Sequence, residues 1–219
     1  MMAFVRSSIG KKYLMGITGL IWAGFLLAHM LGNMLLFLGS EAYNNYSHKL
    51  ITNPIILAAE VVLVVAVLIH IITAITLVLE NKKAKQKLPS MISGGAKSAP
   101  VASSTMAIHG LFILAFLILH LLGFKYGPYY ETTLADGAVV RDIFIVVVEA
   151  FKNPLYVGWY VLCLILLGLH LSHGVSSIFQ SLGFLSYTNQ ETVKVIGIVF
   201  SVIVTFGFIL QPIFVFFVF

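Results

Sequence analysis

Five apolar stretches, each about 20 residues or longer, constrain what this 219-residue chain can fold into. They cover residues 13–38, 54–79, 104–124, 154–180 and 193–218. At ~1.5 Å per residue, each is long enough to cross the ~30 Å hydrocarbon core of a bilayer as an α-helix. The chain is 60% hydrophobic and only 10% charged. We therefore expect an all-α fold, an integral membrane bundle of five transmembrane helices that forms a single domain over residues 1–219.

The net charge of +5 is distributed as a topology signal rather than as a nucleic-acid surface. Nine basic residues fall at one side of the expected bundle: Arg6, Lys11, Lys12, Lys82, Lys83, Lys85, Lys87, Lys97 and Lys194. The other side has four: Lys49, Lys125, Arg141 and Lys152. Because basic loops stay in the cytoplasm, we expect a cytoplasmic N-terminus, an external C-terminus and no nucleic-acid partner. Residues 39–53 and 125–153 are then outer loops.

The chain contains a single cysteine, Cys163. One cysteine excludes an internal disulfide, a cysteine-ligated iron–sulfur cluster held by this chain alone, and a C-x-x-C-H haem attachment. No loop is large enough to be a soluble catalytic domain. Any chemistry must therefore take place within the helix bundle or in a partner.

Six of the seven histidines lie in the expected helices, where a polar ionisable group is costly and indicates function. Four of them, His29, His70, His120 and His170, each follow the start of their helix by 16 residues, or ~24 Å. Because successive helices alternate in direction, His29 and His120 are expected at one depth near the outer surface. His70 and His170 are expected at a second depth near the inner surface.

Two imidazoles at each of two depths suit two bis-histidine metal centres stacked across the membrane. Imidazole is an axial ligand of haem iron, and a haem with a histidine on both faces carries electrons. Zinc fits less well because two histidines without a nearby cysteine or carboxylate pair cannot fill a tetrahedral shell. Gly16, Gly19, Gly24, Ala74 and Gly174 would clear space for a flat macrocycle, although small residues also serve helix–helix packing.

Four segments resemble a known family. They are "SIGKKYLMGITGLIWAGFLLAHMLGN", "EVVLVVAVLIHIITAI", "FILAFLILHLLGFKYG" and "LHLSHGVSSIFQSLG". They are similar to the first four helices of the dihaem cytochrome b membrane anchors of succinate dehydrogenases and quinol:fumarate reductases. The similarity extends over nearly the whole chain, including a fifth helix without ligands.

This resemblance implies that His29 and His120 hold an outer (distal) haem b and that His70 and His170 hold an inner (proximal) haem b. It also implies a flavoprotein subunit and an iron–sulfur subunit docked on the cytoplasmic face of a prokaryotic membrane. The substrate in the anchor would be a quinone, usually menaquinone. One position departs from the pattern: some fumarate reductases carry a glutamate two residues before the fourth ligand, where this chain has Gly168.

Three further side chains are candidates for supporting roles. Glu60 is the one carboxylate well inside an apolar stretch, ~9 Å from the outer side, so we expect a buried acid that could exchange protons with a quinone. His109 and His173 fall toward the inner side and could pair with the propionates of the inner haem. Ser172, Ser176 and Gln180 are alternatives for that pairing. For Glu60 the competing explanation is a carboxylate that reaches out to the membrane interface or bonds a neighbouring hydroxyl. For His109 and His173 it is a structural hydrogen bond.

Two other functions fit part of the pattern. One is a bis-histidine cytochrome b of a different respiratory complex, of the nitrate reductase or formate dehydrogenase type. The other is a haem-free transporter that relays protons through histidines. Transporters more often show inverted repeats and broken helices, and neither is clear here.

Overall fold

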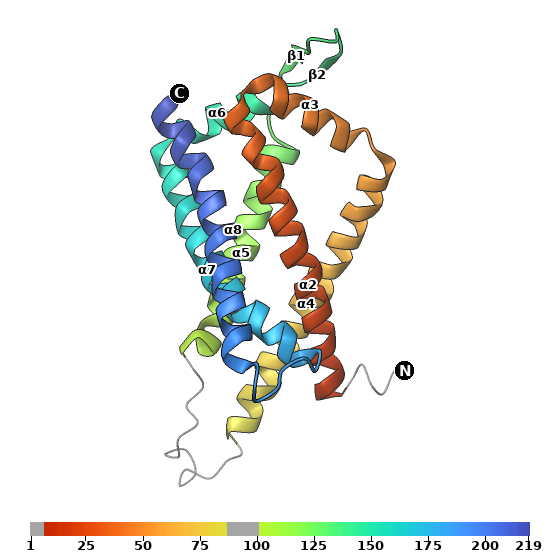
Figure 1. The fold of residues 1–219 in the computed structure, drawn as a ribbon, viewed down its shortest axis with the longest axis vertical. Helices are drawn as coiled ribbons and strands as arrows, with labels where there is room; N and C mark the ends of the chain where they lie inside the picture. The colour runs from red at the N-terminus through yellow and green to blue at the C-terminus, as the bar shows by residue number, and fades with distance from the viewer. Residues whose placement is uncertain (1–6, 87–100) are drawn as a thin grey trace.

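The fold is a bundle of long helices with a small cap at one end (Figure 1). The computed structural model describes residues 7–86 and 101–219. The long elements are α2 (Ser8–Asn33), α4 (Pro54–Gln86), α5 (Val101–His120), α7 (Pro154–Ser181) and α8 (Gln190–Val218). The short ones are η1 (Met34–Leu38), α3 (Ser40–Ile51), η3 (Leu121–Lys125), β1 (Glu131–Thr133), β2 (Val139–Arg141) and α6 (Ile143–Phe151).

The expectation of five membrane-spanning helices is confirmed. Five helical segments are long and apolar enough to cross a membrane: Ser8–Leu38, Pro54–Ala84, Thr105–Lys125, Pro154–Ser181 and Gln190–Val218. The chain is therefore a multi-pass membrane protein. The first helix begins five residues before the predicted start because the Ser7 hydroxyl caps it, accepting a hydrogen bond from Gly10 N at 3.0 Å.

Two of the long helices begin with the same capping sequence, an asparagine followed by a proline. The side chain of Asn53 accepts a hydrogen bond from Ile55 N, and that of Asn153 accepts one from Leu155 N, both at 2.9 Å. Proline follows at the first helical position, where its missing N–H leaves no hydrogen bond unmade. These caps fix the starts of α4 and α7 at the residues that the sequence indicates.

The bundle packs most closely around α7 and α8, with α2 and α5 against α7. Leu164, Leu167 and Leu171 of α7 bury against Val204 and Phe208 of α8. Helix α4 packs mainly on α2 and lies at the edge of the bundle, where most of its side chains are exposed. Exposed apolar side chains on a spanning helix face the lipid, so no protein partner is needed to cover them.

Residues 39–53 and 125–153, expected as loops, contain two short helices and a hairpin. In the hairpin β1 and β2 pair antiparallel, with Thr132 opposite Val140. Asn44 of α3, which is only 1% exposed, donates to the Asp142 carboxylate at 2.8 Å and accepts from Phe144 N at 3.0 Å. These bonds join α3 to α6 and close this end of the bundle, which we call the hairpin end.

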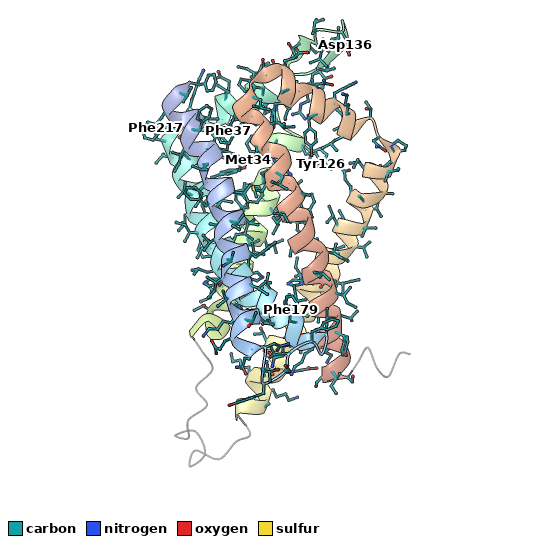
Figure 2. All side chains as sticks on the ribbon, in the orientation of Figure 1. Met34, Phe37, Tyr126, Asp136, Phe179 and Phe217 are labelled. Atoms are coloured by element: carbon teal, nitrogen blue, oxygen red, sulfur yellow. The ribbon has the colours of Figure 1, made fainter. Side chains whose placement is uncertain are left out.

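The opposite end, which we call the N-terminal end, carries basic residues. Lys11 of α2 forms an ion pair with Glu80 of α4, and Lys194 opens α8 beside Glu191. Arg6, Lys87 and Lys97, which the sequence places at this end, lie outside the described residues. Figure 2 shows Asp136 on the hairpin, Phe37 and Phe217 near the same end, and Phe179 near the N-terminal end.

Candidate functional site

The four helix histidines meet in two pairs across the bundle. His29 of α2 and His120 of α5 have ring centres 5.8 Å apart. His70 of α4 and His170 of α7 have ring centres 6.4 Å apart. These are the two pairings expected from depth, and we call them the hairpin-side pair and the N-side pair.

The spacing within the N-side pair is that of two ligands on one metal, and the spacing within the hairpin-side pair is slightly shorter. Two imidazoles that face each other across one metal, with metal–nitrogen bonds of about 2.0–2.1 Å, have ring centres roughly 6.3 Å apart. The N-side distance of 6.4 Å matches this value closely. The hairpin-side distance of 5.8 Å requires a small outward movement of one ring.

The two pairs lie at clearly different levels. Thr18 of α2 touches His70, and His29 follows eleven residues later on the same helix, which corresponds to ~16 Å. Tyr160 of α7 touches His120, and His170 follows ten residues later, which corresponds to ~15 Å. Two separate helices therefore give the same separation between the levels.

On the N-side, the Thr18 hydroxyl lies beside one ring nitrogen of His70. The buried Thr18 hydroxyl donates to Leu14 O at 2.7 Å. Its oxygen lies 3.0 Å from His70 Nδ1 and, with its proton already committed, acts as an acceptor there. When Thr18 accepts in this way, Nδ1 carries the proton and Nε2 keeps its lone pair, which is the form of histidine that binds a metal. The Nδ1 atom of His170 is buried without a hydrogen-bond partner.

On the hairpin side, one ring nitrogen of His120 meets a tyrosine. Tyr160 Oη lies 3.2 Å from His120 Nδ1. Phe116 and Phe124 pack beside the same imidazole, with ring centres 5.8 and 5.3 Å away. A π-helical turn, η3, begins directly after His120, and such turns often occur at functional sites.

His29 is held mainly by packing. Phe25 stacks on its ring at 5.2 Å with an interplanar angle of 15°. Asn33 Nδ2 donates to His29 O at 2.8 Å and reaches the ring only at 3.4 Å. The side-chain oxygen of Asn33 accepts a hydrogen bond of 2.6 Å from the hydroxyl of Tyr43 in α3. The pKa of Tyr43 is raised by burial and, to a lesser degree, by Tyr46. Tyr43 therefore stays protonated and anchors Asn33 to the cap.

The glycines that were expected to clear space fall into two groups. A Cβ atom on Gly24 or Gly174 would meet nothing within 4 Å, so both border open space. A Cβ atom on Gly16 would lie 3.2 Å from Ser181 Cβ, so Gly16 serves the close packing of α2 on α7. Gly19 lies beside His70 and Ile178 at ordinary contact distance.

The number of histidines at each level favours a cofactor that itself supplies most of the ligands of its metal. Within residues 7–86 and 101–219, no three histidine, cysteine or acidic side chains are grouped closely enough to hold a metal ion. Each level offers two imidazoles, whereas a tetrahedral zinc site needs three or four protein ligands. Haem iron needs only two axial ligands because its macrocycle supplies the rest. His29 with His120, and His70 with His170, could each hold one haem.

Glu60 differs from the buried acid that was expected. It forms an ion pair with Lys125 of η3 at 2.6 Å, and both side chains are 41% exposed. The reason is that α4 lies at the edge of the bundle, so its side chains have few protein neighbours. Lys125 follows His120 by five residues, so Glu60 lies on the hairpin side, as its depth predicts.

His109 and His173 both lie close enough to His170 to interact with it electrostatically. His109 is only 9% exposed, and its Nδ1 atom is buried without a hydrogen-bond partner. Ser172 and Ser176 instead donate to backbone carbonyls of their own helix, at Leu169 O and Ser172 O. Of the expected propionate partners, His109 therefore has the clearest unused polar atom. Gln180 is exposed.

Gly168 lies where α7 and α8 touch. A Cβ atom at this position would collide with the Thr205 hydroxyl of α8, which is itself buried without a hydrogen-bond partner. A larger side chain here would therefore require the Thr205 side chain, or the packing of α7 on α8, to shift. Gly168 therefore allows the close contact between α7 and Thr205 of α8.

Thr18 and Tyr160 were not predicted from the sequence. A depth count could have found both. Thr18 is five residues into the first apolar stretch and Tyr160 six residues into the fourth, which places each level with the histidine that it contacts. A hydroxyl group buried at the depth of a histidine in another helix is the signal.

Comparison with protein-family models, with curated proteins and with solved structures gave no match for this chain. The fold and the geometry therefore define its class by themselves. It is a helical multi-pass membrane protein with two histidine pairs at two levels of the bundle.

Proposed function

We propose that the chain is a dihaem cytochrome b that anchors a succinate:quinone oxidoreductase or quinol:fumarate reductase in a prokaryotic cytoplasmic membrane. His29 and His120 would hold one haem b, and His70 and His170 the other. When bound, the haems supply one-electron transfer between a membrane quinone and an iron–sulfur partner. The resemblance of the four helix segments supports the choice of this complex.

One observation carries the proposal. Two histidine pairs, each contributed by two different helices, have ring centres 5.8 and 6.4 Å apart, at levels that helix geometry separates by ~15–16 Å. A relay of histidines for protons would need a continuous row of imidazoles or waters between the levels. On α7, Leu164 and Leu167 lie between the two levels, are buried against α8 and carry no group that could pass a proton.

The chain's own residues orient the ligands and keep water away. Thr18 holds the proton of His70 on Nδ1, and the aromatic rings of Phe25 and Phe116 cover the hairpin-side imidazoles. Glu60 and Lys125 form an ion pair on the hairpin side, and a carboxylate there could take up and release the protons of a quinone. We retain Glu60 as the candidate proton-exchange residue, acting from an ion pair rather than from a buried position.

The N-terminal end would be cytoplasmic and would receive the soluble subunits. Lys11, Lys12, Lys82, Lys83 and Lys194 lie there, and a basic surface favours a cytoplasmic location. A flavoprotein and an iron–sulfur subunit would carry out the dicarboxylate chemistry, because this chain offers neither a soluble domain nor cluster ligands. The orientation can be checked by labelling single cysteines introduced at the two ends.

The test is to express the chain in membranes, purify it and record a reduced-minus-oxidised spectrum with a haem-to-chain ratio. A b-type α-band with two haems per chain is expected. The absence of a b-type band would overturn the proposal. His48→Ala is the matched control, because His48 lies in α3 and belongs to neither pair, and it should retain two haems. Co-purification with a flavoprotein and an iron–sulfur protein, with assays in both directions, then tests the choice of complex.

A further inference from the structure

Two tyrosine hydroxyls form a chain that starts at His120. Tyr160 Oη lies 3.2 Å from His120 Nδ1, and Tyr156 Oη donates to Tyr160 Oη, also at 3.2 Å. The two tyrosines are four residues apart, so they lie on the same face of α7. No other described histidine has a phenol hydroxyl at its ring nitrogen.

The Tyr160 ring has little freedom to move. It is 4% exposed and packs edge-on against Phe116 and Phe151, with ring centres 4.8 and 4.9 Å away. Tyr156 packs on it from the adjacent turn at 4.7 Å. The hydroxyl is therefore held in place by the neighbouring aromatic rings rather than by the histidine itself.

The chemistry of the hydroxyl follows from the role proposed for His120. If His120 binds through Nε2, its Nδ1 carries a proton and must donate. The Tyr160 oxygen then accepts that bond and also the bond from Tyr156, since a phenol oxygen has two lone pairs. An acceptor on the outer N–H of a ligating histidine fixes the orientation of the ring and raises the basicity of the ligand.

We propose that Tyr160 is a positioning residue of the hairpin-side centre: it selects Nε2 of His120 as the ligand and sets the reduction potential of the group held there. Tyr156 moderates this effect, because its donated bond competes for the same oxygen. The proposal rests on the proposed function, since it assumes that the hairpin-side pair holds a haem.

The N-side centre has a different acceptor. Thr18 plays the corresponding part for His70 but is an aliphatic hydroxyl whose proton is committed to Leu14 O. Changing Tyr160 should therefore affect one centre and leave the other as it was. A general loss of packing would instead change the properties of both centres.

The experiment is a potentiometric titration of the purified chain with both haems bound, comparing the wild-type protein with Tyr160→Phe and Tyr156→Phe. Phenylalanine keeps the ring packing and removes only the hydroxyl. For Tyr160→Phe we expect two haems per chain and a hairpin-side potential raised by about 59 mV, a tenfold change in the one-electron equilibrium. The N-side potential should stay the same. For Tyr156→Phe the hairpin-side shift should be smaller and of opposite sign.

A second measurement covers the case in which Tyr160→Phe does not accumulate. In the oxidised wild-type chain, electron–nuclear double resonance in H₂O and in D₂O should detect an exchangeable proton on the outer nitrogen of the hairpin-side axial imidazole. The absence of that proton would overturn the proposal.

The outcomes separate the two ideas. A wild-type chain without haem overturns the proposed function and this inference together. Two haems whose potentials are unchanged in Tyr160→Phe, or are shifted equally at both centres or equally by Tyr156→Phe, overturn only the inference about Tyr160.

Discussion

Each histidine pair is formed by two helices that contribute one histidine each, but the two pairs have different surroundings. The hairpin-side pair sits among aromatic rings, with Phe25 on His29 and Phe124 on His120. On the N-side, Gly19 lies beside both His70 and Ile178, and the Nδ1 atom of His170 has no hydrogen-bond partner. One bundle therefore places two histidine pairs in two different environments. Which histidines pair therefore follows from depth, whereas the surroundings of each pair follow from the packing of neighbouring side chains.

The largest expected effect comes from removing one ligand of one pair. His170→Ala should lose the N-side haem and keep the hairpin-side haem, so the haem-to-chain ratio should fall from two to one. His173→Ala, one turn away, should keep both, because His173 belongs to neither histidine pair. The ratio and the α-band measure this outcome. A His170→Ala protein with two haems would show that the pairing is wrong.

Glu60 tests the hairpin side alone. Glu60→Gln should abolish quinol oxidation or quinone reduction while both haems stay bound, because an amide cannot exchange the proton. Glu149→Gln is the matched control, since Glu149 also forms an ion pair at this end, with Lys152 at 2.6 Å. Quinone turnover by the assembled complex is the measurement, and unchanged turnover in Glu60→Gln would remove Glu60 from the site.

Thr18 tests the N-side in the corresponding way. Thr18→Val keeps the shape of the side chain but removes the acceptor of His70 Nδ1. Loss of such a supporting contact typically lowers metal affinity about 10–100-fold, so the N-side haem should exchange faster while the hairpin-side haem does not. Haem transfer to apomyoglobin measures the difference. Thr18→Ser should restore the wild-type rate, and equal loss from both centres would contradict the assignment.

The smallest effect is expected at Gly168, close to the N-side pair. Gly168→Ala would push its new methyl group against Thr205, and overpacking of this kind typically costs about 1–3 kcal/mol. The midpoint of thermal unfolding in detergent should fall, and the double variant Gly168→Ala with Thr205→Ala should recover part of the loss, because it removes the hydroxyl that the new methyl group would meet. A midpoint that does not change would mean that α7 and α8 are less closely packed at this level.

The sequence indicated the spans and the histidine pairs because both depend on simple rules. Apolar length predicts a spanning helix, and rise per residue predicts depth, so His29 and His120 could be paired by counting residues alone. The sequence did not predict the helix α3 at the hairpin end, because the mixed composition of this segment is typical of a loop. The helix depends on contacts between residues far apart in the sequence, such as Asn44 with Asp142. The exposure of Glu60 was missed for a similar reason, since it depends on how far α4 stands from the rest of the bundle.

Helices α4 and α7 begin with the same Asn-Pro sequence, so the positions of their histidines can be counted from equivalent residues. His70 and His170 each follow the proline of that sequence by 16 residues. One inserted residue between Pro54 and His70 would raise the imidazole by ~1.5 Å and turn it by ~100° around the helix, away from its partner. Insertions should therefore be tolerated in the segments that join the helices. They should not be tolerated between the proline that starts each of these two helices and its histidine.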